Sequence, residues 1–279
     1  MLERSSSYEN LRSLCKGVGN RLSGTKSAEE AVKWASFKLN SYDFDTVYLQ
    51  EITVPHWERG DVERFDWTDN NGQLHITNCT ALGGTIGTNG VLSGEIVEIN
   101  SWDELKQIGR DGIDGKFVFF NRPMNPTYVS TFMAYGNCVD QRHGGAARAA
   151  EYGAIGVIVR SMTLYFDNNP HTGSMGYKKD IDKIPALAIS TKDAHDLSEA
   201  LKSNNFESAK MKLSSKILDD KVSHNVIAEI KGSVYPEKII LVGGHLDSWD
   251  IGEGAHDDGA GAVQSIEVLK TFIDLGVKP

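Results

Sequence analysis

The sequence predicts an α/β fold in which one domain is split by an inserted α/β module. Short apolar, β-branched runs alternate with stretches whose apolar residues recur at helical spacing, which is typical of strands and helices packed in layers. The composition changes after Pro55, because residues 61–95 are rich in Asn, Gly and Thr and indicate turns between short strands. We therefore expect a split domain formed by residues 1–56 and 217–279, interrupted by an insert over 57–216.

The first segment of the split domain is predicted to hold two helices and a strand. Residues 7–16 have helical character. Ser27 and Glu30 have the spacing of a capping box, and the apolar residues that follow recur at helical spacing, so a helix is expected to begin there. A strand near Val47–Val54 follows and is expected to end at Pro55.

The insert is predicted to contain a parallel βαβ unit, because two apolar strands flank an alanine-rich helix. The helix should end at Gly153, since glycine is common just past the end of a helix. The expected elements are a strand at 116–120, a helix at 140–152, strands at 155–159 and 184–189, and a helix capped near Ser190 or Thr191.

The second segment of the split domain carries the most informative residues. Ile239–Val242 is a short β-branched apolar run, which predicts a buried parallel strand. His245 then lies at the carboxyl end of this strand, where open α/β sheets place their ligands. Asp247 points to the same side because strand side chains alternate with period two. Asp257 comes just ahead of a helix expected over about 260–275.

A histidine and a carboxylate that meet at a strand end suit a zinc-type cation, which accepts imidazole nitrogen and carboxylate oxygen. His245 and Asp257 are therefore candidate ligands, and Asp247 is placed to orient the imidazole. A surface hydrogen-bonded His–Asp pair is the alternative. A phosphate loop starting at Gly252 is disfavoured, because Asp257 stands where the third glycine of G-x-G-x-x-G belongs and repels phosphate.

Several spaced motifs resemble one peptidase family. They are Gly244-His245-Leu246-Asp247-Ser248-Trp249-Asp250 followed by Asp257-Asp258-Gly259, Arg21-Leu22-Ser23-Gly24, Pro55-His56-Trp57-Glu58-Arg59-Gly60, Pro170-His171-Thr172-Gly173 and Asn225-Val226-Ile227-Ala228-Glu229-Ile230. In these motifs, and in their order along nearly all of the chain, the sequence resembles the di-zinc aminopeptidase-like exopeptidases. The resemblance implies an incomplete zinc-peptidase-like mixed sheet with helices on both faces, interrupted by a protease-associated-like α/β insert.

The same resemblance implies roles for individual residues. It implies that His245 binds one zinc ion, that Asp257 bridges two zinc ions, and that Asp247 orients His245. It also implies a cis peptide bond between Asp257 and Asp258. His256 stands where the family has an apolar residue, and we weigh it as a bystander against an extra ligand.

The remaining parts of the family's site are expected after the last helix. They are a Glu-Glu pair, whose first member is the general base and whose second is a ligand, then an aspartate and a histidine. No Glu-Glu pair follows Asp257 in this chain. The sequence therefore predicts a truncated peptidase that lacks its general base and would be inactive and poorly soluble by itself.

Composition and charge limit the partners. The chain has 40% hydrophobic and 24% charged residues, which suits a globular protein, and a net charge of −9, which disfavours nucleic acid and anionic membranes. No apolar run is long enough to span a membrane, and no signal peptide is visible at the N-terminus. The three cysteines, Cys15, Cys79 and Cys138, form no C-x-x-C pair and are expected to be buried free thiols.

Two functions from different classes follow from these observations. The leading hypothesis is a zinc-dependent exopeptidase that hydrolyses dipeptides or short peptides with free C-termini by metal-activated water. By resemblance, such an enzyme is secreted or lysosomal and forms a homodimer in its full-length form. The alternative is an inactive truncated fragment that acts as a weak metal-binding or interaction module.

Overall fold

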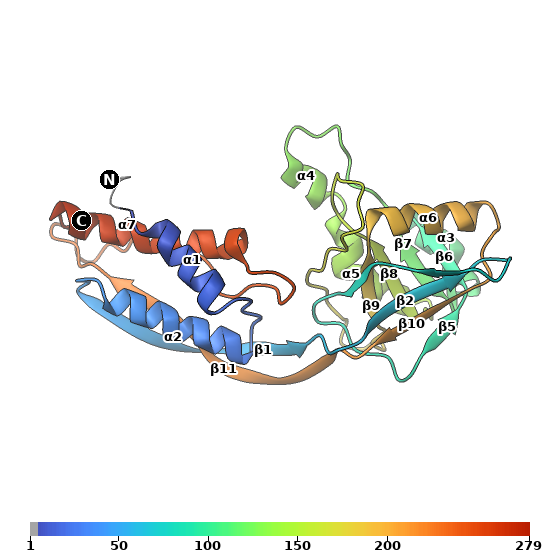
Figure 1. The fold of residues 1–279 in the computed structure, drawn as a ribbon, viewed down its shortest axis with the longest axis horizontal. Coiled ribbons are helices and arrows are strands. Elements are labelled where there is room, and N and C mark those ends of the chain that lie inside the picture. Colours follow the sequence, from blue (N-terminus) through green and yellow to red (C-terminus); the bar gives the residue numbers. More distant parts are fainter. Residues whose placement is uncertain (1–4) are drawn as a thin grey trace. The chain divides into compact units, whose positions relative to one another are not determined.

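The computed structural model describes residues 5–279, which divide into two compact units (Figure 1). The first unit is formed by the chain up to His56 together with Leu218–Pro279. The second unit is Trp57–Ile217, where the sequence predicted an insert over 57–216. Each unit has its own sheets, helices and packed side chains.

The first unit combines a two-stranded sheet with helices. Its elements are α1 (Ser7–Gly17), α2 (Lys26–Asn40), β1 (Thr46–Glu58), β11 (Lys216–Glu229), the short π-helical turn η2 (Ala255–Ala260) and α7 (Gly261–Leu275), with β1 paired to β11. Helix α1 packs against both η2 and α7. The apolar side chains that recur along α2, among them Val32 and Ala35, are buried, as their helical spacing predicts.

The start of α2 and the end of β1 differ from the prediction. The N-cap of α2 is Thr25, whose hydroxyl accepts a hydrogen bond from the Ala28 N–H at 3.3 Å. Thr25 has extended backbone whereas Ser27 is already helical, so the predicted capping box at Ser27 and Glu30 is not the cap. Strand β1 does not end at Pro55, because it runs on to Glu58.

The prediction of a buried strand at Ile239–Val242 is wrong. The structure assigns no strand there, and Ile240 is 90% exposed. A buried parallel strand requires hydrogen-bonded neighbours and covering helices. Among residues 5–279 no strand pairs with this run, so its β-branched character alone does not place it in a sheet.

The second unit contains two sheets and four helices. The four-stranded sheet has the order β3 (Leu74–Ile76), β2 (Glu63–Thr68), β10 (Ser208–Leu213), β5 (Leu92–Gly94), and all its pairs are antiparallel. The five-stranded sheet has the order β4 (Cys79–Ala81), β9 (Ala186–Ile189), β8 (Gly156–Arg160), β7 (Phe117–Phe120), β6 (Ile96–Ile99), with only β4 antiparallel to its neighbour. The helices are α3 (Trp102–Ile113), α4 (Thr131–Gly136), α5 (Val139–Ala150) and α6 (Thr191–Lys202).

The predicted βαβ unit is confirmed, since β7 and β8 are parallel and α5 connects them. Alternate side chains of β7 point to opposite faces of the sheet. Val118 and Phe120 belong to a buried cluster with side chains of α3 and α5. Phe117 makes an edge-on contact with Phe65 of β2, with ring centroids 6.4 Å apart. The five-stranded sheet therefore packs against α3 and α5 on one face, and its other face contacts the four-stranded sheet.

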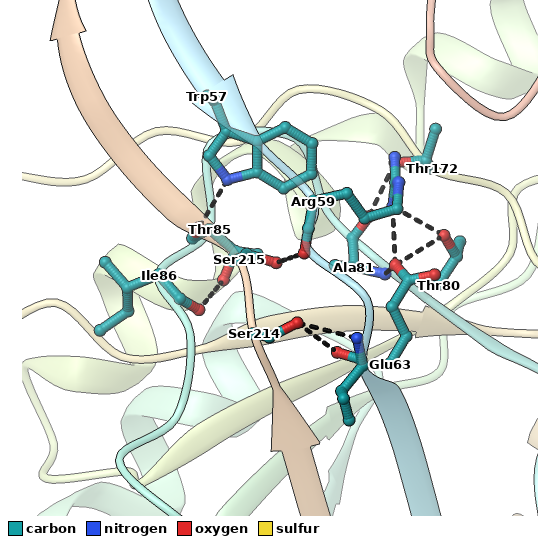
Figure 2. Close-up of polar contacts among 11 residues, drawn as sticks. Trp57, Arg59, Glu63, Thr80, Ala81, Thr85, Ile86, Thr172, Ser214 and Ser215 are labelled. Carbon is teal, nitrogen blue, oxygen red and sulfur yellow. Dashed lines mark hydrogen bonds and ion pairs between the residues drawn. The ribbon is translucent and has the colours of Figure 1, made fainter.

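A buried polar cluster surrounds Arg59, just after β1 (Figure 2). The guanidinium donates hydrogen bonds to the Glu63 carboxylate at 2.8 Å, the Thr80 hydroxyl at 2.8 Å and the Ala81 carbonyl at 2.7 Å. The Ser215 hydroxyl donates to the Arg59 carbonyl at 2.9 Å. Arg59 thus joins the beginning of β2 and the end of β4 to the segment between β10 and β11.

Two further predictions can be compared with the structure. No helix among residues 5–279 is long and apolar enough to cross a membrane. The three cysteines are free, with Cys15 and Cys138 buried and Cys79 half-buried.

Candidate metal site

The first unit brings His245 and Asp257 together. The Nε2 atom of His245 lies 3.0 Å from Oδ1 of Asp257, although the two residues are separated by a loop. His245 follows the exposed apolar run, and Asp257 belongs to η2. Both side chains are solvent-exposed, so an ion from solution can reach them. The convergence that the sequence predicted is present, although the strand expected to carry His245 is not.

The other imidazole nitrogen of His245 faces Asp247. Its Nδ1 atom is 3.1 Å from the Asp247 carbonyl oxygen and 3.3 Å from the Asp247 carboxylate. The predicted geometry, with Asp247 within reach of the second ring nitrogen, is therefore observed. The backbone carbonyl was not foreseen as the nearer partner, because side-chain alternation along a strand says nothing about carbonyl directions in a loop.

Asp258 is a residue of this site that the sequence analysis missed. Its carboxylate accepts hydrogen bonds from the His245 backbone N–H at 3.2 Å and from the Gly261 backbone N–H at 3.1 Å. It thereby ties the histidine to the first turn of α7. The signal in the sequence was an aspartate shortly before a helix, whose carboxylate can accept a backbone N–H of the first helical turn. The Asp257–Asp258 peptide bond is cis, as expected from the resemblance.

The electrostatic surroundings of His245 favour a cation. Burial by itself lowers the pKa of the imidazole, but the Asp247 carbonyl and the carboxylates of Asp247, Asp257 and Asp258 outweigh burial and raise the pKa above its usual value. The same groups that stabilise a proton on the ring also stabilise a metal ion bound beside it.

The donor atoms that converge at this site are of the types that bind zinc. Imidazole nitrogen and carboxylate oxygen are both ordinary zinc ligands, and a carboxylate beside the second ring nitrogen is a common support. Within the described part of the chain, no three His, Cys, Asp or Glu side chains are placed to hold one metal ion together. A catalytic zinc ion has three protein ligands and a water, so residues 5–279 provide only part of such a set.

The remaining histidines do not join the pair. His256 lies on η2 with an exposed side chain, next to Asp257 in sequence. His143 is exposed on α5, in the second unit, and His171 is half-buried in a loop of that unit. His245 and Asp257 are therefore the metal-site candidates that the structure brings together, and His256 keeps the bystander interpretation.

Comparisons with known proteins agree with the peptidase resemblance. Residues 225–279, which contain both candidate ligands, match Peptidase family M28. Carboxypeptidase Q of Bos taurus is 38% identical over 275 residues, which is 98% of this chain and 56% of that protein. The chain thus spans about half the length of the curated relatives it matches.

Solved structures show the same relationship. A Peptidase M28 precursor from Shewanella amazonensis SB2B is 38% identical, with a TM-score of 0.92 over 99% of this chain and 62% of the other. A zinc aminopeptidase from Bacillus subtilis, at 19% identity and a TM-score of 0.63 over 95% of this chain and 57% of the other, shares the fold. The chain is therefore a homologue of carboxypeptidase Q with the α/β fold of M28 peptidases.

Proposed function

We propose that the protein is a zinc-dependent exopeptidase that hydrolyses dipeptides or short peptides with free C-termini. The observation that carries this proposal is the 3.0 Å approach of His245 Nε2 to Asp257 Oδ1 in a homologue of carboxypeptidase Q. Both residues lie in the segment that matches Peptidase family M28. The zinc aminopeptidase that shares the fold supports zinc as the metal.

The roles of the residues follow from their contacts. His245 and Asp257 would hold zinc, and by the resemblance Asp257 would bridge a second ion. When bound, zinc supplies an activated water and stabilises negative charge that develops on the scissile carbonyl oxygen. Asp247 occupies the Nδ1 side of the imidazole, which leaves Nε2 facing Asp257. Asp258 holds the His245 backbone against α7.

The proposal extends to the rest of the protein. The first unit would be the peptidase domain, and the second unit a protease-associated-like insert. A homodimer and a secreted or lysosomal location are further parts of the proposal, because the family resemblance implies both. The additional ligands and the general base that two zinc ions require are not provided by residues 5–279.

A second candidate function rests on that last observation. Because His245 and Asp257 are the two donors that converge among residues 5–279, the alternative is that the protein acts as a weak metal-binding module. Zinc affinity and peptide hydrolysis distinguish the two functions, since a weak module binds metal without turnover.

The test begins with zinc affinity. We expect the purified chain to bind zinc in competition with a chromophoric chelator, and His245→Ala and Asp257→Asn each to weaken binding at least about tenfold, because each removes one of two ligands. His143→Ala is the matched control, since that histidine is exposed in the second unit and should leave affinity unchanged. Equal zinc affinity in wild type and His245→Ala would overturn the site.

The second arm measures catalysis. A panel of dipeptides and of longer peptides with free or amidated C-termini is incubated with the protein and zinc. Hydrolysis that requires zinc, a free C-terminus and His245 supports the exopeptidase proposal. Zinc binding through His245 without hydrolysis of any peptide supports the metal-binding module instead.

A further inference from the structure

Arg21 is fully buried, and its guanidinium is held mainly by backbone oxygens, with the Cys15 side chain as a further partner. Its exposed fraction is 0%, and no carboxylate forms an ion pair with it among residues 5–279. The guanidinium instead donates to four carbonyl oxygens, those of Leu246 at 2.7 Å, Gly19 at 2.8 Å, Glu253 at 2.7 Å and Gly254 at 2.8 Å. A buried cation without such partners would be strongly destabilising, so these bonds fix its place.

Three of the four carbonyls belong to the segments that carry the candidate metal ligands. Leu246 directly follows His245, and its carbonyl accepts from Nε of Arg21. Glu253 and Gly254 directly precede η2, which carries Asp257, and accept from the two Nη atoms. The planar guanidinium is therefore hydrogen-bonded both to the segment that carries His245 and to the segment that leads into Asp257.

The chain around Arg21 reinforces this bridge. The Arg21 N–H donates to the Ser248 hydroxyl, and the Ser248 N–H donates to the Arg21 carbonyl, both at 3.0 Å. The Asn20 side chain donates to the Asp250 carbonyl at 3.1 Å. Lys16, at the end of α1, forms an ion pair with Glu253 at 2.6 Å. Residues 16–21 thus contact the loop between the two ligands at several points.

Packing at Gly254 also depends on Arg21. Gly254 has φ +57°, and a Cβ atom there would lie 2.6 Å from Nη2 of Arg21. The Gly254 carbonyl, which accepts from Arg21, also accepts the Gly259 N–H at 3.0 Å. The guanidinium is therefore linked by one shared oxygen to the turn that positions Asp257.

We propose that Arg21 is a positioning residue of the metal site: it sets the separation of His245 and Asp257 by joining the backbones of both ligand-bearing segments. This inference rests on the proposed zinc function. Arg21 does not touch the imidazole or the carboxylate, so it acts through the loop and not on the metal itself.

Lysine cannot replace this arrangement. The guanidinium presents donors in a fixed planar fork, and its bonds point to carbonyls on different segments. A lysine ammonium has three donors on one nitrogen, so it cannot reach the carbonyls of both backbone segments. Arg21→Lys therefore keeps the charge and much of the volume but removes the bridge.

The experiment compares Arg21→Lys with a matched core variant, Leu39→Ala, in the metal-free and zinc-titrated protein. Leu39 is a buried side chain of α2, outside the two segments that carry the ligands, so its truncation lowers global stability without removing a contact of Arg21. We expect Arg21→Lys to weaken zinc binding roughly 10–100-fold, the range for loss of a supporting contact. Leu39→Ala should bind zinc like wild type.

Hydrogen exchange of the metal-free protein gives a second readout. Amides of residues 246–259 should exchange faster in Arg21→Lys, while those of α2 stay protected; Leu39→Ala should show the opposite pattern. Ser248→Ala, which removes the hydroxyl contacts with the Arg21 N–H and the Trp249 carbonyl, provides a milder variant if Arg21→Lys does not fold.

The failures are distinguishable. Absence of zinc binding by the wild-type chain would contradict the proposed function, and loop exchange would still report whether Arg21 joins the two segments. Wild-type zinc affinity and unchanged exchange at 246–259 in a folded Arg21→Lys protein would overturn the positioning role.

Discussion

Replacing Gly244 with alanine should move His245 away from its metal-binding position. A Cβ atom at Gly244 would lie 2.4 Å from the Ala262 backbone nitrogen and 2.5 Å from the Gly261 carbonyl carbon. These atoms belong to the first turn of α7, so they cannot rotate away as a flexible side chain would. Because the segment before Gly244 is exposed and unpaired, the loop should give way and the helix should stay.

The size of the effect follows from these distances. Ordinary van der Waals contact begins at 3.4 Å, so the loop must shift by about 1 Å. Metal–ligand distances tolerate only about 0.2 Å. We therefore expect zinc affinity to fall roughly 10–100-fold, about 1.4–2.7 kcal/mol. The free energy of unfolding should fall by no more than about 1–3 kcal/mol, the usual range for overpacking.

Gly243→Ala is the matched control. It adds the same methyl group one residue earlier, where nothing lies within 4 Å. Its zinc affinity should equal that of wild type, and its stability should be unchanged or higher by about 0.4–1 kcal/mol. Zinc affinity is measured by chelator competition and stability by urea denaturation. Equal zinc affinity of the two alanine variants would refute the assigned geometry of the 244–245 segment.

Further predictions concern both units. Arg59→Met leaves the Glu63 carboxylate, whose side chain is 21% exposed, without this cation. The free energy of unfolding, measured by urea denaturation, should therefore fall by about 2–3 kcal/mol, less than the roughly 3–5 kcal/mol lost when a fully buried ion pair is broken. Burial, with help from the Glu63 charge, raises the pKa of Cys79 to about 12, so iodoacetamide at pH 8 should label it only after denaturation; fast native labelling would contradict this. The pKa of His245 is raised above the usual 6.5, so protons compete with zinc for its imidazole and zinc affinity should fall as the pH drops from 8 through this raised pKa; a pH-independent affinity would be inconsistent with His245 as ligand. Ile240→Lys should increase solubility, measured by sedimentation, without loss of stability, because Ile240 is 90% exposed.

Local patterns predicted much of the secondary structure. The helical spacing of Val32 and Ala35, and the succession of an apolar run, an alanine-rich helix and a second apolar run in 116–159, describe elements that the structure contains. These features depend on residues close in sequence, so they can be predicted without knowledge of the tertiary structure. Exact starts were less predictable, since Thr25 and Ser27 are both good caps and only the backbone conformation decides between them.

The sequence by itself determined the chemistry of the candidate site, because the residue types at His245 and Asp257 already specify imidazole and carboxylate donors. Their 3.0 Å approach, the carbonyl facing Nδ1 and the part played by Asp258 were decided by tertiary structure. The same holds for Ile239–Val242, whose apolar character favours a strand but whose conformation depends on neighbours. Arg21 shows the reason most clearly, since the oxygens that hold it come mainly from residues more than 200 positions away.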